Sequence, residues 1–330
     1  MPYTLWRLRT EIAANMGQSH GTGWGCLILF RRSSDKDSVT GSAAPTNVNV
    51  KDQALRALAQ LPPFSPILNR LIASLAQEDV SFAKISDLIE KDTALAGNVL
   101  RLVNSALYGL RGTVNSIRHA VSLLGIAKLR NATLSMSVAR MWSQVKTPPG
   151  WSMARFNLHS VGVAILADLL AQGQAVDYAE GAFAAGLFHD LGLLLVALGL
   201  PEEYKQIALL HQQSPKWIIE YELQVLGMTH LELSAEALAV WNLPEPIQRA
   251  VRFTETPDID PTVVGPDEIR LSRVLNVADR YVRGTGTSLS LFEGTREDGQ
   301  LAIESLGLGE RLPQVLSEFE AEFSTIQSYF

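Results

Sequence analysis

In this chain of 330 residues, the side chains best suited to metal binding or catalysis are those of two histidines and two aspartates. His159 lies in a helical pattern, His189 and Asp190 follow as a pair, and Asp279 comes far downstream. Neutral imidazole suits a borderline transition metal and carboxylate suits a hard cation. A divalent ion held by both types lowers the pKa of bound water and offsets phosphate charge. These residue types are therefore compatible with a metal site.

Two structural interpretations compete with a metal site. His189 lies in a strongly apolar stretch, residues 179–200, where a hydrogen-bonded core histidine is common. Asp279 can instead form an ion pair on its helix with Arg280 or Arg283. The residues alone leave both interpretations open.

Helical periodicity governs the chain from Asp52 onward, and no alternating pattern is long enough for a sheet. Thr93 is placed to cap one helix, Ser81 and Ser116 to cap two others, and Thr229 with Glu232 fits a capping box. Further helices are expected at 126–142, 267–282 and 313–328. The predicted fold is all-α, a helical bundle in two parts that divide near Pro148 and Pro149.

Composition excludes several classes of protein. The net charge of −6 argues against a non-specific nucleic-acid binder, so a nucleic-acid partner is not expected. The single cysteine, Cys26, excludes an internal disulfide framework and a cysteine-rich zinc site. No apolar run reaches the roughly 18 residues of a membrane helix, and no export signal is recognised. We expect a cytoplasmic protein with no membrane partner.

The first half carries a series of segments that resembles the HDOD domain. They are LPPF at 61–64, LIEKD at 88–92, LRLVNSALYG at 100–109, SIRHAV at 116–121 and LLG at 123–125. GMTHLE at 227–232 and WNLP at 241–244 also resemble HDOD segments. The resemblance covers residues 52–282. It implies an output or scaffold role in bacterial signalling.

The second half resembles the related HD phosphohydrolases. LFHDLG at 187–192 is similar to their HD signature, and their metal ligands come in the order His, His-Asp, Asp. The resemblance implies that His159, His189, Asp190 and Asp279 hold one divalent metal, either iron, manganese, zinc or magnesium. Composition, the prolines at 148 and 149 and the resemblance together lead us to expect four segments: a poorly ordered tail at 1–50, an N-terminal helical half at 51–146, an HD-like half at 150–284, and a C-terminal loop and helix at 285–330 that pack on the HD-like half.

The sequence departs from active HD-GYP phosphodiesterases. Leu193 replaces a lysine, the stretch 251–255 lacks paired histidines, and no GYP triplet is present. We therefore interpret the chain as a non-catalytic regulatory module. It would bind a signalling protein partner or a nucleotide second messenger through the cleft between its halves. The alternative is a metal-dependent phosphohydrolase acting on a nucleotide or cyclic dinucleotide.

Five further residues have two interpretations each. His230, at the first turn of a helix, is structural or a further metal ligand. Asn104 and Ser105 end a helix through local hydrogen bonds, or they form a binding edge for a partner or small ligand with Tyr108 and Arg111. The sequence carries no signal of an oligomeric state.

Overall fold

The computed structural model describes residues 47–73, 86–87, 89–105, 112–214, 217–287, 289 and 295–327. Contacts divide the chain into two units, Met1–Pro45 and Thr46–Phe330, and the account below concerns the second. Among the described residues there are helices and one isolated bridge, between Val176 and Ile269, but no strand. The predicted all-α fold is confirmed. The predicted tail lies outside the described residues up to position 46.

The first part of this unit contains helices of moderate length. They are α2 (Asn47–Arg56), η1 (Ala57–Gln60), α3 (Pro66–Ala73), α5 (Thr93–Val103), α6 (Ile117–Leu124) and α7 (Ile126–Trp142). Ser116 caps α6 as predicted, and Gly125 ends it with a φ of +79°. Thr93 is not the cap of α5: the carboxylate of Asp92 accepts from the backbone N–H of Leu95, so the helix starts at Thr93. Ser81 lies outside the described residues.

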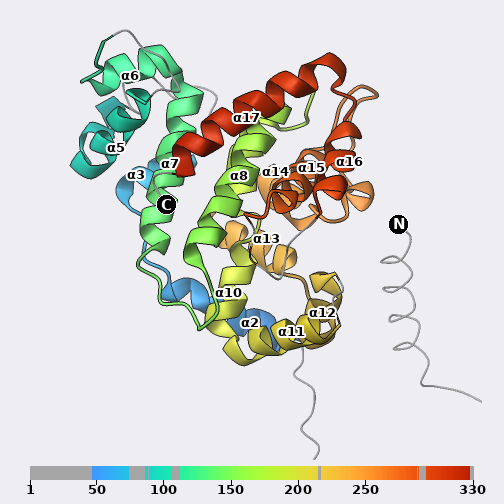
Figure 1. Cartoon of the computed structure of the whole chain (residues 1–330). Helices are drawn as coiled ribbons and strands as arrows, with labels where there is room; N and C mark the ends of the chain where they lie inside the picture. Colours follow the sequence, from blue (N-terminus) through green and yellow to red (C-terminus); the bar gives the residue numbers. More distant parts are fainter. Residues whose placement is uncertain are drawn as a thin grey trace, which may run out of the picture. The chain divides into compact units, whose positions relative to one another are not determined.

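The second part of the unit holds most of the buried core. Its elements are α8 (Met153–Ala171), η4 (Ala179–Gly181), α9 (Ala182–Phe188), α10 (Leu191–Gly199), α11 (Pro201–Gln213), α12 (Ile218–Val225), α13 (His230–Val240), α14 (Glu245–Arg252), η5 (Pro257–Ile259), α15 (Leu271–Gly284), α16 (Arg296–Glu304), η7 (Gly309–Arg311) and α17 (Leu312–Gln327). Helix α8 lies at the centre, and α9, α15 and α17 pack on it (Figure 1).

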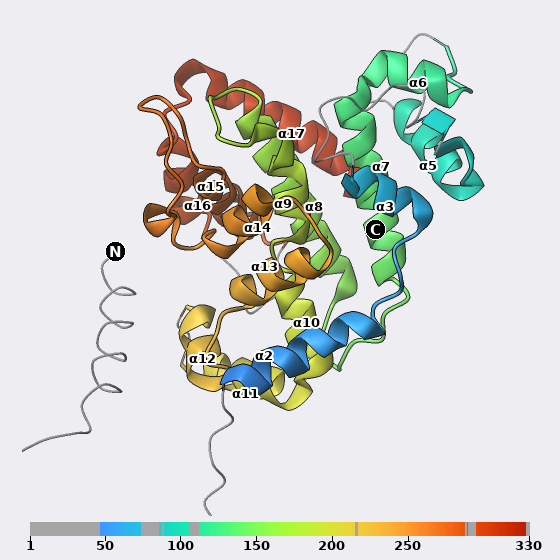
Figure 2. The ribbon, with the colours of Figure 1, turned by 180° about the vertical axis from the view of Figure 1, so that it is seen from behind.

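Helix α2 packs on helices that lie far from it in the sequence. It contacts α10 and α13, and the side-chain amide of Gln53 donates to the carbonyl of Gly199 over 3.1 Å. Figure 2 shows α2 alongside α10. Val50 and Ala54 are buried in this contact. The start of the described chain therefore covers part of the core formed by the second half.

Two helix boundaries differ from the predicted ones. Helix α15 starts at Leu271 and not at 267, because Ile269 pairs its backbone with Ala175 and Asp177 on a neighbouring segment. Helix α17 starts at Leu312, one residue before the predicted position.

The capping box is confirmed: Thr229 accepts from the N–H of Glu232, and the Glu232 carboxylate accepts from the N–H of Thr229.

Two described stretches are long and apolar enough to cross a membrane by length and composition. They are Met153–Ala171 and Ala179–Gly199. Their most apolar windows are 72% and 94% buried inside the protein. Their apolar side chains are thus the core of this helical unit, as expected of helices that are apolar on all sides.

Candidate metal centre

Three helices and the turn between two others bring the candidate ligands to one buried place. His159 comes from the middle of α8, His189 and Asp190 from the turn between α9 and α10, Asp279 from α15, and His230 from the first residue of α13. None of these five side chains is more than 4% exposed. Residues separated by up to 120 positions in sequence therefore share one site inside the core.

Imidazole nitrogens and carboxylate oxygens face one another across this site. The Nε2 of His159 lies 3.1 Å from Asp279 Oδ1 and 3.4 Å from Asp190 Oδ2. The Nε2 of His189 lies 3.2 Å from Asp190 Oδ1 and 3.7 Å from Asp279 Oδ1. Ligands about 2.1 Å from an octahedral ion are separated by about 3 Å. The observed distances are thus near the spacing of atoms that share one ion.

Two glycines let the helices approach closely enough for this convergence. A Cβ on Gly186 would lie 2.7 Å from the Cα of Ala164, so α9 packs directly on the backbone of α8. A Cβ on Gly192 would lie 1.9 Å from the carbonyl oxygen of His230, so α10 packs directly on the start of α13. The backbone N–H of Gly192 also donates to Ser234 Oγ over 2.7 Å. These contacts require glycine at both positions.

Two of the histidines are oriented through their Nδ1 atoms. His189 Nδ1 lies 2.7 Å from the carbonyl oxygen of Gly186, which can only accept. His230 Nδ1 lies 2.8 Å from the carboxylate of Glu222, which also accepts from the backbone N–H of His230. A proton on Nδ1 leaves Nε2 as the nitrogen that faces the site. Outer partners of this kind are the usual support of metal-binding imidazoles.

Charge within the centre shifts the ionisation of its members. Burial opposes protonation of His189, but the carboxylates of Asp190 and Asp279 outweigh it and raise its pKa to about 10. His230 behaves alike: burial is outweighed by Glu222 and Asp190, and its pKa is also raised to about 10. Burial favours the neutral form of Asp190, yet His189 and His230 hold the pKa of that carboxyl well below its ordinary value. Without a metal, the imidazoles of His189 and His230 therefore carry protons.

The polar atoms at the centre fit a divalent cation. Among the described residues, His159 Nε2, His189 Nε2 and Asp279 Oδ1 are buried and have no partner in hydrogen-bond geometry. Ligand atoms of His159, His189 and Asp279 all lie within 4.8 Å of one another. Buried carboxylates need a compensating charge. A borderline divalent metal satisfies both imidazole and carboxylate, so the donor set and the geometry agree.

Distances show which of the two nearby arginines, Arg280 or Arg283, forms the ion pair with Asp279. Arg283 Nη2 lies 2.6 Å from Asp279 Oδ2, whereas Arg280 pairs with Asp298 on α16. Asp279 therefore takes part both in an ion pair on its own helix and in the candidate metal site, the two interpretations that the sequence left open. Its Oδ2 meets a guanidinium and its Oδ1 faces the histidines.

Comparison with known proteins shows the family to which the chain belongs. Residues 61–257 match the family model of the HDOD domain. The chain belongs to the HDOD domain family. The matched range is shorter than the resemblance expected from the sequence, and it ends before Asp279.

Solved structures share this HDOD fold. An HDOD domain protein of unknown function from Geobacter sulfurreducens is 21% identical with a TM-score of 0.67, over 86% of this chain and 99% of that one. A candidate signal transduction protein from Marinobacter aquaeolei VT8 is 21% identical with a TM-score of 0.63, over 86% and 66%. A candidate phosphohydrolase from Shewanella amazonensis SB2B is 22% identical with a TM-score of 0.61, over 83% and 98%. At these identities the likeness shows the fold alone.

A curated relative extends beyond this HDOD chain. An uncharacterized protein from Treponema pallidum (strain Nichols) is 24% identical over 74% of the chain. The match covers 52% of that relative, so the chain spans about half of its length.

The other predicted residues of the HDOD chain lie away from the centre or outside the described residues. Asn104 caps α5: its Nδ2 donates to the carbonyls of Leu100 and Val114, and its Oδ1 accepts from the N–H of Val114. These contacts give Asn104 a structural role. Ser105 follows at the end of the same helix. Tyr108 and Arg111 lie outside the described residues.

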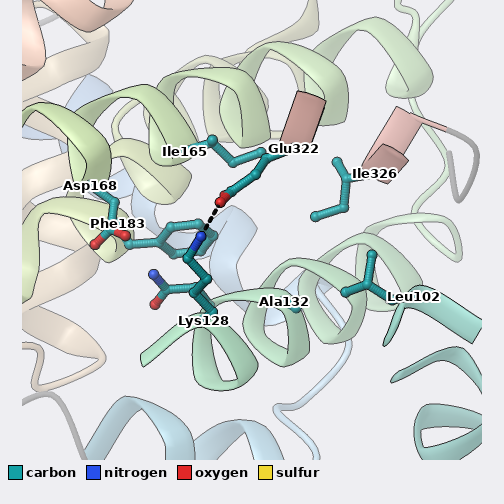
Figure 3. Close-up of a pocket in the computed structure, with 9 residues that line it drawn as sticks. Leu102, Lys128, Ala132, Ile165, Asp168, Phe183, Glu322 and Ile326 are labelled. Carbon is teal, nitrogen blue, oxygen red and sulfur yellow. Dashed lines mark hydrogen bonds and ion pairs between the residues drawn. The ribbon is translucent and has the colours of Figure 1, made fainter. Parts of the chain in front are cut away.

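Among the described residues, two of the cavities that lie outside the metal centre are well defined. The larger has a volume of 340 Å³ and is lined by residues of α3, α5 and α7 and of the segments before α3 and α5, among them Pro63, Met136 and the ion pair of Asp92 with Arg140. Its volume is within the range of small-ligand pockets. The smaller, of 30 Å³, is bordered by Lys128 of α7 and Glu322 of α17, which form an ion pair at 2.6 Å (Figure 3).

Two carboxylates of the centre were not predicted from the sequence. Glu222 holds His230, and Glu255 pairs with Arg283 over 2.9 Å. A signal for Glu222 was available, because it follows the buried Ile218 by four positions on one face of α12. A carboxylate on a buried face needs a partner. Glu255 follows the end of α14 outside any periodic pattern, and only the fold reveals its partner.

Proposed function

We propose that this HDOD chain is a regulatory or output module of bacterial signalling, and that its centre holds one divalent metal in a non-catalytic role. His159, His189, Asp190 and Asp279 would hold the ion, with His230 as a further ligand. The module would pass on a signal by binding a protein partner or a nucleotide second messenger. Arg140 and the cavity of 340 Å³ beside it are a candidate contact for such a nucleotide.

The burial of the candidate ligands is the observation that supports this proposal. The side chains of His189 and Asp279 are 0% exposed, and those of His159 and Asp190 are 3% and 4% exposed. A catalytic metal keeps an open position for water and substrate. A phosphodiester has no access to these side chains unless surrounding helices move. A buried ion instead favours a structural or switching role.

The ion would supply positive charge where the fold buries carboxylates. Imidazoles from α8 and α9 and carboxylates from the α9–α10 turn and α15 would then be held to a common point. His189 is held by Gly186 and His230 by Glu222, so their Nε2 atoms are already oriented. An ion that binds only the folded state stabilises that state by mass action.

The second candidate function is metal-dependent phosphohydrolysis. The convergence of two imidazoles with two carboxylates supports it, since this set can activate water. Three positions in the chain weigh against it. Leu193, where active HD-GYP enzymes carry lysine, is a buried core residue, and Phe253 and Thr254 supply no imidazole.

Hydrolysis assays distinguish the two functions. Purified protein is incubated under reducing conditions with manganese, iron or magnesium and with cyclic dinucleotides or nucleotides. We expect no multiple turnover, because the centre is closed and lacks a lysine at position 193. The matched variants are His189→Ala in the centre and His119→Ala, an exposed histidine on α6. Turnover that is lost in His189→Ala and kept in His119→Ala would establish the enzyme and end the regulatory proposal.

A further inference from the structure

Arg283 is a buried cation beside the metal centre. Its Nη2 lies 2.6 Å from Asp279 Oδ2, and its Nη1 lies 2.9 Å from Glu255 Oε1. The side chain is only 9% exposed. Burial opposes its charge, but Asp279 and Glu255 outweigh it and raise the pKa of Arg283 above its already high ordinary value. The guanidinium is therefore charged at every accessible pH.

Asp279 connects this guanidinium to the candidate metal ligands. Its Oδ1 faces the Nε2 atoms of His159 and His189, whereas its Oδ2 faces Arg283. A carboxylate with one oxygen toward each of two cations is the arrangement that carboxylates adopt between paired metal ions, which lie about 3.5–4 Å apart. With an ion at Oδ1, the guanidinium at Oδ2 stands on the side where a second ion would lie.

On the side of Arg283 away from Asp279 there is the carboxylate of Glu255 but no imidazole among the residues of the stretch 251–255. Glu255 ends the stretch 251–255, where Phe253 and Thr254 precede it. Thr254 is buried and donates to the carbonyl of Ala250, so its hydroxyl is used within its own segment. Two carboxylates, Asp279 and Glu255, thus flank a place that a fixed guanidinium fills.

The position of Arg283 affects the charge balance of the centre. Four carboxylates gather in and around the centre, those of Asp190, Glu222, Glu255 and Asp279. One divalent ion and Arg283 together supply three positive charges. One divalent ion alone supplies two, which leaves two buried carboxylates without a countercharge, a costly state. With Arg283 present, one carboxylate is left without a countercharge; without Arg283 two are left, and a second divalent ion would compensate both.

We propose that Arg283 is a built-in cation that takes the place of a second metal ion and limits the centre to one divalent ion. It acts as a specificity-determining residue for the number of ions bound. The inference rests on the proposed metal centre and adds the reason why that centre is mononuclear.

Metal stoichiometry tests the proposal through Arg283→Met, which keeps length and removes charge. Wild type and variant are equilibrated with manganese, freed of unbound ion, and measured for metal per protein and for melting temperature with and without manganese. We expect one ion in the wild type and two in Arg283→Met. We also expect the variant to melt lower than wild type without metal and to gain more from manganese. Arg283→Lys, which keeps the charge, should bind one ion.

Arg280→Met is the matched control, because Arg280 lies on the same helix but pairs with Asp298 away from the centre. It should bind one ion and respond to manganese as wild type does. If Arg283→Met binds one ion with the wild-type gain in melting temperature, the proposal is overturned. If the wild type binds no ion at all, the proposed metal centre fails instead.

A double variant keeps the test decisive if Arg283→Met alone is insoluble. Glu255→Gln with Arg283→Met removes one negative and one positive charge together. The proposal requires this double variant to be soluble and to bind one ion. An insoluble double variant, or one that binds none, would show that Arg283 acts through packing and not through its charge.

Discussion

At the scale of single residues, protons and a metal ion compete for the same imidazole nitrogens. Without metal, Asp190 and Asp279 keep His189 protonated to about pH 10, against an ordinary pKa of 6.5. Glu222 and Asp190 do the same for His230. A metal binds only neutral imidazole, so an incoming ion must displace these protons.

This competition predicts that metal affinity rises with pH. The folded-state pKa of His189 is raised, so its protonation stabilises the metal-free protein fully below about pH 6.5, and this contribution is lost as pH rises toward 10. We expect manganese affinity to increase from pH 6.5 to 8.5 with release of protons. Calorimetry in two buffers of different ionisation enthalpy measures the release, and His119→Ala is the control. A pH-independent affinity without proton release would contradict the assigned protonation.

The residue types of the centre were readable from the sequence, but their partners were not. His159, His189, Asp190 and Asp279 were selected because their order resembles that of a known ligand set. Glu222 and Glu255 are not part of that order. The buried face of α12 indicates only that Glu222 needs some partner, and folding brings the two carboxylates to His230 and Arg283. Pairing across 28 positions, as between Glu255 and Arg283, leaves no local pattern in a single sequence.

At the scale of elements, close helix contacts at glycine position the ligands. Gly186 sits where a Cβ would press on the backbone of Ala164, between the helices that carry His159 and His189. Gly97, in contrast, is exposed on α5, and an added Cβ would meet nothing within 4 Å.

These two helical glycines form a matched pair for mutation. Gly186→Ala should lower the free energy of unfolding by about 1–3 kcal/mol, because the backbones of α8 and α9 must move apart. It should also weaken metal binding, since His159 and His189 separate. Gly97→Ala should raise the free energy of unfolding by about 0.5–1 kcal/mol through helix propensity. Urea denaturation with and without manganese measures both, and shifts of the same sign would refute the packing argument.

Helix caps were predictable where the side chain acts on its own backbone. Ser116 and the Thr229–Glu232 capping box are local features and were predicted correctly. The start of α15 was not, because Ile269 forms backbone hydrogen bonds with Ala175 and Asp177 from a distant segment. Thr93 was displaced as a cap by its neighbour Asp92, which also pairs with Arg140.

At the scale of the whole molecule, α2 closes the core that surrounds the centre. It buries Val50 and Ala54 against elements that include α10 and α13, which carry or adjoin ligands. The segment 33–49 has a polar, small-residue composition without an apolar period. These two observations predict different results for two truncations.

Removal of residues 1–45 should leave cooperative thermal unfolding of the remainder intact. Removal of residues 1–60, which deletes α2 and η1 as well, should lower the melting temperature sharply, because apolar surface of α10 and α13 becomes exposed. Scanning calorimetry of both products against the full chain provides the measurement. Loss of cooperativity in the shorter truncation would show that residues 1–45 belong to the core.

The measurement that tests the central claim most directly is the melting temperature of chelator-treated protein during titration with manganese, iron or zinc. At a free metal concentration about one hundred times Kd, a single site adds about 2.7 kcal/mol, which corresponds to a rise of roughly 5–10 °C. The account predicts a saturable rise of this size, absent in His189→Ala and Asp279→Asn and retained in the exposed controls His119→Ala and Asp258→Asn. An unchanged melting temperature with every metal, and no metal in untreated protein, would contradict it and leave the cluster a purely structural network.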